Sequence, residues 1–368
     1  MNDKLKIIIS GGGTGGHIFP AVSIANELRD RLPNSEILFV GADGRMEMER
    51  VPAAGYKIIG LPIMGFPRKP GIKTVSFFFK LAASLRRARR VIKQFEPDVV
   101  VGVGGYASGP VLRMASNLKI PSLIQEQNSY AGITNRWLAK KVDKICVAYN
   151  NMEKYFPARK IVYTGNPVRK ELLQGKTKID EARSFYQLES GKKVLLVVGG
   201  SLGARTLNDS VLKNIDLLKN SNVEVIWQTG KFYYDKVLQA TTGMSLHNIH
   251  IHQFLSRMDL AYAVADLVVS RAGAGTISEL CLMGCPTILV PSPNVAEDHQ
   301  TKNAQALVNQ NAAVMVSDTD APSVLIPKAI NLIENDDELT KLSNSILQLA
   351  KPNAASDIVD LILTLANK

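Results

Sequence analysis

The chain has 368 residues, which favours two domains over one. Apolar residues make up 46% of it and charged residues 21%, a globular composition that excludes the disordered and fibrous classes. Lysine and arginine number 44 against 33 aspartates and glutamates, and the net charge of +11 indicates an anionic partner: nucleic acid, a phosphorylated substrate or a membrane surface.

The cysteines and the N-terminal segment bear on the compartment. Cys146, Cys281 and Cys285 lack the paired spacing of zinc or disulfide sites, which favours a reducing compartment. The apolar run before the first glycines is too short for a signal peptide, and nowhere do about 18 apolar residues follow one another. We therefore expect a cytoplasmic chain with neither a signal peptide nor a transmembrane helix.

The first half of the chain alternates strand-like runs with helical patterns. The runs are KLKIIIS, EILFV, YKIIGL, DVVVGVGG, PSLIQE and KICVA. Strands that alternate with helices form a parallel sheet covered on both faces. Residues 1–165 are therefore predicted to be an α/β, doubly wound domain.

A second domain of the same kind is predicted after a linker in YTGNPVRKELLQGKTKID. Its strand-like runs lie in KKVLLVVGG, VEVIWQTG, IHIHQF, ADLVVS and PTILVPSP, within residues 166–350. Residues 351–368 contain an amphipathic helix, and the pattern does not say on which domain this helix packs.

Four glycine-rich turns follow predicted strands, at residues 11–16, 102–109, 199–203 and 273–275. Glycine turns before helices present unpaired N–H groups, which favours a phosphate-bearing ligand in a cleft at the strand ends. No turn ends in the Gly-Lys-Ser/Thr of a Walker loop. The first turn has the spacing of a dinucleotide fingerprint, and with Asp43 as a ribose ligand a nicotinamide dehydrogenase remains an alternative.

Seven motifs together resemble one family. GGTGGHIFPA, GVGGYASGP, EQNSYAGITNRWLAK, GNPVR, GGSLGARTLN, RAGAGTISEL and EDHQTKNA occur in the order found in the MurG-type N-acetylglucosaminyltransferases of peptidoglycan synthesis. The resemblance implies a GT-B fold, in which two doubly wound parallel-sheet, Rossmann-like domains face each other across a deep cleft. It implies an acceptor and membrane-facing first domain and a donor-binding second domain.

The reaction that the resemblance implies is an inverting hexosyl transfer. N-acetylglucosamine (GlcNAc) would move from UDP-GlcNAc to the C4 hydroxyl of N-acetylmuramate (MurNAc) in undecaprenyl-pyrophosphoryl-MurNAc-pentapeptide, or lipid I, giving lipid II and UDP. Such a displacement needs a base for the acceptor hydroxyl and a stabiliser for the leaving UDP. His17 is the candidate base, because the start of a helix disfavours imidazolium. A histidine that only hydrogen-bonds the turn is the alternative.

Other site residues follow from matching the motifs. Arg169 would bind UDP or its phosphates, and Ser201 with the neighbouring backbone N–H groups would hold the pyrophosphate. The main chain of Leu255 would bind the uracil, and Glu279 the ribose. Asn128 and Gln300 would bind GlcNAc hydroxyls. The remaining donor candidates are the glycine-turn residues Thr14, Gly15, Gly16, Ala274, Gly275 and Thr276, and the acceptor candidates are Gly104, Gly105, Tyr106 and Glu126.

We expect no metal or other cofactor. Asp318 and Asp320 in SDTDAPS form an acid-x-acid pair of the kind that holds Mn²⁺ or Mg²⁺ in other glycosyltransferases. Asp320 precedes Ala-Pro-Ser at a predicted helix start, so N-capping is the favoured role. Helix ends and Arg169 would serve the donor instead.

The basic charge has a place in GIKTVSFFFKLAASLRRARRVIKQ, a basic amphipathic helix. It suggests peripheral binding to the inner face of the plasma membrane through Phe77, Phe78, Phe79, Arg86, Arg87, Arg89 and Arg90. The phenylalanines could equally be core residues. Nucleic acid is not expected, because no known binding module is present.

Two other functions are compatible with these patterns. A UDP-GlcNAc 2-epimerase shares the architecture but needs acidic groups at the sugar that the sequence does not place. A non-catalytic protein that binds a nucleotide sugar or a lipid pyrophosphate would not need His17.

Overall fold

The computed structural model describes residues 4–65, 71–169, 171–172 and 177–367. Contacts within the chain divide it into two compact units: unit 1 comprises residues 1–168 and 351–368, and unit 2 comprises residues 169–350. Each unit is built on its own parallel sheet. Within the expected linker, residues 170 and 173–176 lie outside the described residues.

Unit 1 contains a seven-stranded parallel sheet in the order β3-β2-β1-β4-β5-β6-β7. The strands are β1 (Lys6–Ser10), β2 (Glu36–Ala42), β3 (Lys57–Leu61), β4 (Val99–Gly102), β5 (Ser122–Glu126), β6 (Lys144–Val147) and β7 (Ile161–Tyr163). The helices are α1 (Gly15–Arg31), α2 (Glu47–Ala53), α3 (Ile72–Phe95), α4 (Ser108–Asn117), α5 (Ile133–Leu138), η1 (Ala158–Lys160) and α16 (Ala354–Ala366).

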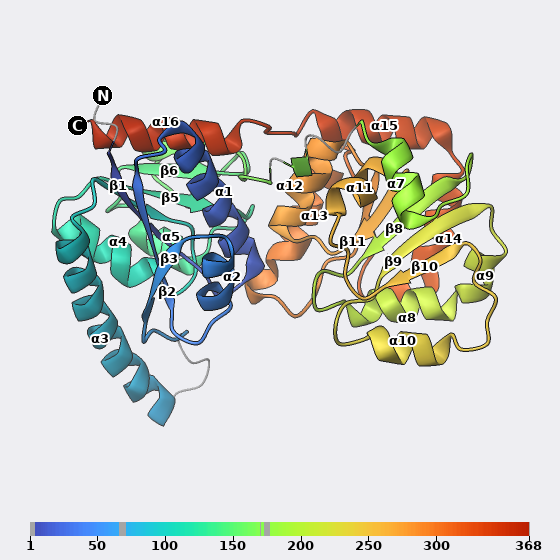
Figure 1. The fold of residues 1–368 in the computed structure, drawn as a ribbon, viewed down its shortest axis with the longest axis horizontal. Helices are drawn as coiled ribbons and strands as arrows, with labels where there is room; N and C mark the ends of the chain where they lie inside the picture. Colours follow the sequence, from blue (N-terminus) through green and yellow to red (C-terminus); the bar gives the residue numbers. More distant parts are fainter. Residues whose placement is uncertain (1–3, 66–70, 170, 173–176, 368) are drawn as a thin grey trace. The chain divides into compact units, whose positions relative to one another are not determined.

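The interior strand β1 shows how both faces of this sheet are covered. Ile7 and Ile9 pack in a core with residues of α1 and α16, whereas Ile8 packs in the core formed with α3, α4 and α5 (Figure 1). All three isoleucines are fully buried. A continuous β-branched run is therefore what this central position requires.

The C-terminal helix α16 belongs to unit 1, which settles the partner that the sequence left open. Ile358 and Ile362 share a core with Ile24 and Leu28 of α1. The guanidinium of Arg31 lies 2.6 Å from Asp360. The chain thus returns to its first domain after completing the second.

Unit 2 contains a six-stranded parallel sheet in the order β10-β9-β8-β11-β12-β13. The strands are β8 (Lys193–Val198), β9 (Val223–Gln228), β10 (Ile249–His252), β11 (Leu267–Ser270), β12 (Thr287–Leu289) and β13 (Val314–Met315). The helices are α7 (Ile179–Tyr186), α8 (Arg205–Lys213), α9 (Ile215–Lys219), α10 (Tyr234–Ala240), α11 (Met258–Val264), α12 (Ala274–Met283), η2 (Ala296–Asp298), α13 (His299–Val308), α14 (Ala321–Ile333) and α15 (Asp336–Leu347).

The sheet of unit 2 is also covered on two faces, with α8 and α10 on one and α7 and α11 on the other (Figure 1). The core on the α8 side includes Trp227 of β9, which is fully buried. Its indole N–H donates to Asn208 Oδ1 at 2.9 Å, so the polar edge of this large side chain is satisfied. In the part of the chain that the structure describes, none of the helices has the length and hydropathy required of a bilayer-spanning helix.

Candidate active site

The glycine turn between β1 and α1 is a bare backbone that touches a second glycine turn. Gly13 has a φ of +87°, in the region that favours glycine. The turn after β4 contains Gly104 and Gly105, with φ of +93° and +83°. A side chain on Gly105 would collide with the carbonyl oxygen of Gly12. The two turns can approach each other only because these positions lack a Cβ.

The side chain of Glu47, in α2, accepts hydrogen bonds from the backbone of the first glycine turn and of β2. Its side chain is buried, with 1% of the residue exposed, and its carboxylate accepts from Gly13 N at 2.8 Å and from Ala42 N at 3.0 Å. A side chain on Gly12 would overlap this carboxylate. Sequence reasoning missed Glu47, because it lies outside the glycine motif. The structure makes it the group that fixes the turn next to His17.

His17 lies in the first turn of α1 and is half-buried. Its Nδ1 is 3.0 Å from Gly12 O and 3.3 Å from Thr14 Oγ1. Because a carbonyl oxygen only accepts, the bond to Gly12 places the ring proton on Nδ1 and leaves the lone pair on Nε2. Nε2 lies beside Gly104, where an added Cβ would be 2.8 Å away. The arrangement suits a neutral imidazole that accepts a proton at Nε2.

The loop after β5 is organised around Glu126. This residue is 2% exposed, and Oε1 accepts from Asn128 N at 3.1 Å and Asn128 Nδ2 at 3.4 Å. Oε2 accepts from Asn135 Nδ2 at 2.9 Å and Gly132 N at 3.0 Å. Burial raises the pKa of Glu126, while these hydrogen bonds act in the opposite direction. Glu126 thus shapes the loop that carries Asn128, and the buried Asn135 is a further member that sequence reasoning missed.

The other acceptor candidates, Gly104, Gly105 and Tyr106, lie in the turn after β4. Tyr106 is about half exposed, and a side chain on Gly65 would contact its ring. Ser108 begins α4 and donates to Ser10 O at 2.7 Å and to Gly104 O at 2.8 Å. These bonds join the ends of β1 and β4. The turn is therefore held in one conformation beside His17.

Unit 2 repeats the pairing of two glycine turns. Gly203, in the turn after β8, has a φ of +87°, and Gly230, after β9, has a φ of +82°. Their backbones lie so close that a side chain on either would collide with the other turn. Ser201 lies exposed in the first of these turns, four residues before α8 begins at Arg205. It is placed at the carboxyl end of β8, as expected.

Arg169 and Glu279, both expected at the donor, lie together in unit 2. Glu279 is on α12, whose first turn contains Ala274, Gly275 and Thr276. Its Oε1 accepts from Arg169 Nη2 at 3.0 Å, and its Oε2 accepts from the hydroxyl of Tyr262 at 3.1 Å. The carboxylate and the guanidinium thus lie more than one turn along α12 from the helix start that is expected to meet phosphate.

Two further donor candidates lie in loops of unit 2. Leu255 has a buried side chain, so its main chain is the part that a ligand could contact. Gln300 is in the first turn of α13, and its Oε1 accepts from Ser292 N at 2.8 Å. That bond fixes the Gln300 side chain to the loop after β12.

The aspartate pair has structural roles. Asp318 lies 2.5 Å from Arg271 Nη1 and accepts from Thr206 Oγ1 at 3.0 Å. Asp320 occupies the N-cap position of α14 as expected, but its carboxylate accepts from Ser317 Oγ at 2.7 Å and makes no capping bond. Among the described residues, no group of three or more His, Cys, Asp and Glu side chains could hold a metal ion.

The cysteines are buried, as their sequence setting favours. Burial raises the pKa of Cys146 and of Cys281 to about 12. Both groups therefore remain thiols at neutral pH, which is unsuitable for a nucleophile.

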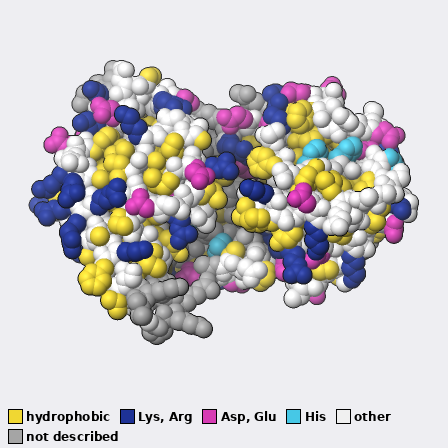
Figure 2. All heavy atoms as spheres, turned by 60° about the horizontal axis from the view of Figure 1, so that its bottom comes forward, with side chains coloured by type: hydrophobic (Ala, Val, Ile, Leu, Met, Phe, Trp, Pro, Cys, Tyr) yellow, Lys and Arg dark blue, Asp and Glu magenta, His cyan; other side chains and the backbone are white. Residues whose placement is uncertain are grey.

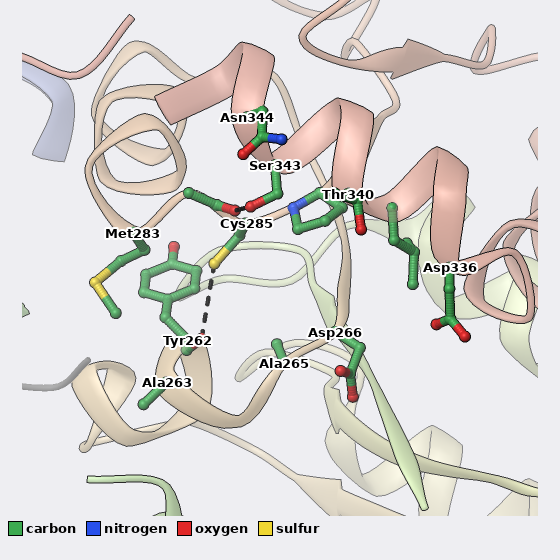
Figure 3. A pocket seen from close by; sticks show the side chains of 13 residues that line it. Tyr262, Ala263, Ala265, Asp266, Met283, Cys285, Asp336, Thr340, Ser343 and Asn344 are labelled. Carbon is green, nitrogen blue, oxygen red and sulfur yellow. Dashed lines mark hydrogen bonds between the residues drawn. The ribbon is translucent and has the colours of Figure 1, made fainter. Parts of the chain in front are cut away.

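A hollow of about 480 Å³ in unit 2 lies away from these candidates (Figure 3). It is lined by the end of α11, the end of α12 and one face of α15, and includes Asp266 and Pro286. These two residues directly precede β11 and β12, so the hollow is at the amino ends of the strands. Ser201 follows the opposite, carboxyl end of β8, and Ala274, Gly275 and Thr276 follow that of β11. Tyr262 is the residue that both lines the hollow and contacts Glu279.

The basic helix α3 presents its aromatic residues unequally. Phe78 is 58% exposed and Phe79 is 74% exposed, so neither is a core residue, while Phe77 is partly buried. The arginines of the helix are exposed: Arg86, Arg87, Arg89 and Arg90. Figure 2 shows Lys and Arg side chains gathered at the left edge of unit 1 in this view, with hydrophobic side chains near them. The core alternative therefore fails for Phe78 and Phe79.

Known proteins are similar to this chain over both of its units. Residues 7–147 match the glycosyltransferase family 28 N-terminal domain, and residues 194–361 match the family 28 C-terminal domain. A Parabacteroides distasonis protein is 58% identical over 99% of both chains. A Porphyromonas gingivalis protein is 56% identical over 98% of this chain and 95% of its own. Both are named UDP-N-acetylglucosamine--N-acetylmuramyl-(pentapeptide) pyrophosphoryl-undecaprenol N-acetylglucosamine transferase.

Solved structures show the same fold. A crystal structure of Acinetobacter baumannii MurG has a TM-score of 0.79 and 30% identity, covering 98% of this chain and 99% of its own. A UDP-GlcNAc 2-epimerase from Neisseria meningitidis, bound to UDP-GlcNAc, has a TM-score of 0.67 over 98% of this chain and 100% of its own. Its sequence is only 16% identical, so this likeness shows the fold alone. The chain belongs to glycosyltransferase family 28 and has the two Rossmann-like domains of the GT-B fold.

Proposed function

We propose that this protein transfers GlcNAc from UDP-GlcNAc to the C4 hydroxyl of MurNAc in undecaprenyl-pyrophosphoryl-MurNAc-pentapeptide. The products are lipid II and UDP, and the anomeric carbon is inverted. The observation that carries the proposal is the 58% identity, over nearly the whole chain, to a relative named for this transfer. His17 and the Arg169–Glu279 pair supply groups that such a transfer needs.

In this proposal His17 is the general base. Nε2 takes the proton of the C4 hydroxyl as that oxygen attacks C1 of GlcNAc. The C1–O bond to UDP breaks on the opposite face, and its electron pair leaves with the β-phosphate oxygen. The bond from Nδ1 to Gly12 O supports this role, because it holds the ring in the required tautomer and stabilises the imidazolium that forms.

Unit 2 binds the donor in this proposal. The first turn of α12, with Ala274, Gly275 and Thr276, and the turn that carries Ser201 receive the pyrophosphate. Arg169 adds a positive charge against the UDP that leaves, while Glu279 accepts from the ribose hydroxyls. The main chain at Leu255 meets the uracil. Gln300 binds hydroxyls of the sugar in unit 2. In unit 1, the candidates for contact with the sugar are Asn128 and the turn of Thr14, Gly15 and Gly16.

A membrane surface is the second partner that we propose. The acceptor carries a lipid, so the protein must reach it at the cytoplasmic face of the plasma membrane. Phe78 and Phe79 are exposed on α3, and the helix also carries four exposed arginines. Shallow insertion of the aromatic rings together with attraction of the arginines to anionic headgroups would bind the protein peripherally.

The test is transfer of radiolabelled GlcNAc from UDP-GlcNAc to a lipid I analogue, with and without EDTA. The wild-type protein should transfer the sugar equally in both. His17→Ala should lower the rate by about 100-fold or more while the dissociation constant for UDP stays unchanged. His299→Ala is the matched control, since His299 also lies in the first turn of a helix and has no assigned role. Binding of UDP-GlcNAc without any transfer would instead indicate a binding protein, and conversion of the free nucleotide sugar would indicate an epimerase.

A further inference from the structure

Tyr262 touches the carboxylate that we assign to the ribose. It lies on α11 with only 3% of its surface exposed, and its hydroxyl donates to Glu279 Oε2 at 3.1 Å. The other oxygen, Oε1, accepts from Arg169. A carboxylate has about four acceptor positions, so these two bonds leave acceptor capacity for a ribose. The side chain of Glu279 keeps 18% of its surface exposed, and a ligand can therefore reach it.

The tyrosine itself is rigidly placed. Its ring is one wall of the hollow at the amino ends of β11 and β12, and Cys285 Sγ lies 3.7 Å from its main-chain oxygen (Figure 3). Cys285 directly follows the turn that ends α12, and Ser343 of α15 donates to Gly284 O in that turn at 2.8 Å. The backbone of Tyr262 is thus tied to one end of α12, and its hydroxyl to Glu279 within the same helix.

The hydroxyl of Tyr262 acts as a donor. Burial raises the pKa of Tyr262 well above its usual value, and the negative charge of Glu279 raises it further. The phenol therefore keeps its proton, and the bond to Glu279 has one direction. A hydrogen bond to a charged acceptor is stronger than a neutral one, so it can hold one rotamer of a partly exposed side chain.

We propose that Tyr262 is a positioning residue that orients the Glu279 carboxylate to recognise the ribose of a uridine nucleotide. The inference rests on the proposed function, because Glu279 is the ribose ligand only if the protein binds a nucleotide donor. Tyr262 contacts no substrate itself. Its loss should weaken recognition of the ribose hydroxyls specifically, because the carboxylate would lose one of the two side-chain bonds that the described residues give it and keep the bond from Arg169.

The experiment compares the dissociation constants of UDP and 2′-deoxy-UDP, measured by calorimetry, for the wild-type protein and Tyr262→Phe. The wild type should bind UDP more tightly. Tyr262→Phe should weaken UDP binding roughly five- to tenfold and leave 2′-deoxy-UDP within about twofold, since it removes one bond to the ribose ligand. Tyr56→Phe in unit 1 is the matched control: it also removes one hydroxyl, which donates to Asn26 at 2.7 Å.

The ratio of the two constants separates positioning from folding. A loss of folded protein lowers the bound amount of both nucleotides equally and leaves the ratio unchanged. Adding Tyr262→Phe to Glu279→Ala should have no further effect on the ratio, because the partner is already gone. A Tyr262→Phe ratio equal to that of the wild type would overturn the inference while the donor site stands. A wild-type protein that binds both nucleotides equally would overturn the ribose role of Glu279 first, and the inference with it.

Discussion

Gly104→Ala should disable the proposed base, His17, without weakening the binding of UDP. The new Cβ would lie 2.7 Å from His17 Cδ2, whereas ordinary contacts begin at 3.4 Å, so the imidazole must shift by the difference of 0.7 Å. A shift of that size would stretch the 3.0 Å bond from Nδ1 to Gly12 O. Displacing a catalytic group by about 1 Å costs roughly 100-fold in rate. The φ of +93° adds about 1–2 kcal/mol of backbone strain to the folded state.

The assay is kcat for GlcNAc transfer at saturating acceptor, with UDP binding and urea unfolding measured on the same preparation. Gly44→Ala is the control, because Gly44 is in the same unit, has a φ of +68°, and an added Cβ there meets nothing within 4 Å. Both variants should lose stability through the strain of a positive φ, Gly104→Ala the more because its Cβ also meets His17, and only Gly104→Ala should lose kcat. Wild-type kcat in Gly104→Ala, or an equal loss in Gly44→Ala, would refute the placement of His17 against this glycine.

Two further results are expected. Replacing Phe78 and Phe79 together by serine should lower binding to anionic vesicles at least tenfold, as measured by vesicle sedimentation. The reason is that each exposed ring contributes apolar area to insertion. Transfer to a short-chain soluble acceptor should stay unchanged. Because burial raises the pKa of Glu126 above its ordinary 4.5, its contribution to stability is complete below that pH and is lost as pH rises through the folded pKa. As the pH rises from 4.5, the free energy of unfolding should therefore fall more steeply with pH in the wild type than in Glu126→Gln, as measured by urea unfolding, and parallel curves would contradict this.

The sequence predicted the fold best at the strands that are buried on both faces. Ile7 to Ile9 form a continuous apolar run because their side chains alternate between two covered faces, and Val99 to Val101 repeat the pattern in the adjacent strand. The strand β13 consists of Val314 and Met315 alone, which is too short to produce a pattern. The partner of α16 was also unreadable, because an apolar helix face does not specify what it packs against.

The sequence motifs predicted part of the candidate site, but the residues that support it lie outside those motifs. Arg169 and Glu279 were named from separate motifs, and the structure brings them within 3.0 Å. Glu47 lies 34 residues after Gly13, and Tyr262 lies 17 residues before Glu279. Neither belongs to a glycine turn, and single buried polar residues have no local signature. Only their partners, which the fold brings together, show what they do.

Buried carboxylates explain how unit 1 fixes loops that must remain bare. Large apolar side chains could not hold a glycine turn that, as we propose, a sugar diphosphate approaches, because they would fill the space that the ligand needs. Glu47 instead accepts two backbone N–H groups, and Glu126 accepts donors from its own loop on both oxygens. Both acids are buried, while His17 and Asn128 beside them are only partly buried. The acids therefore hold the loops through hydrogen bonds and leave exposed surface on the side chains that we propose as substrate contacts.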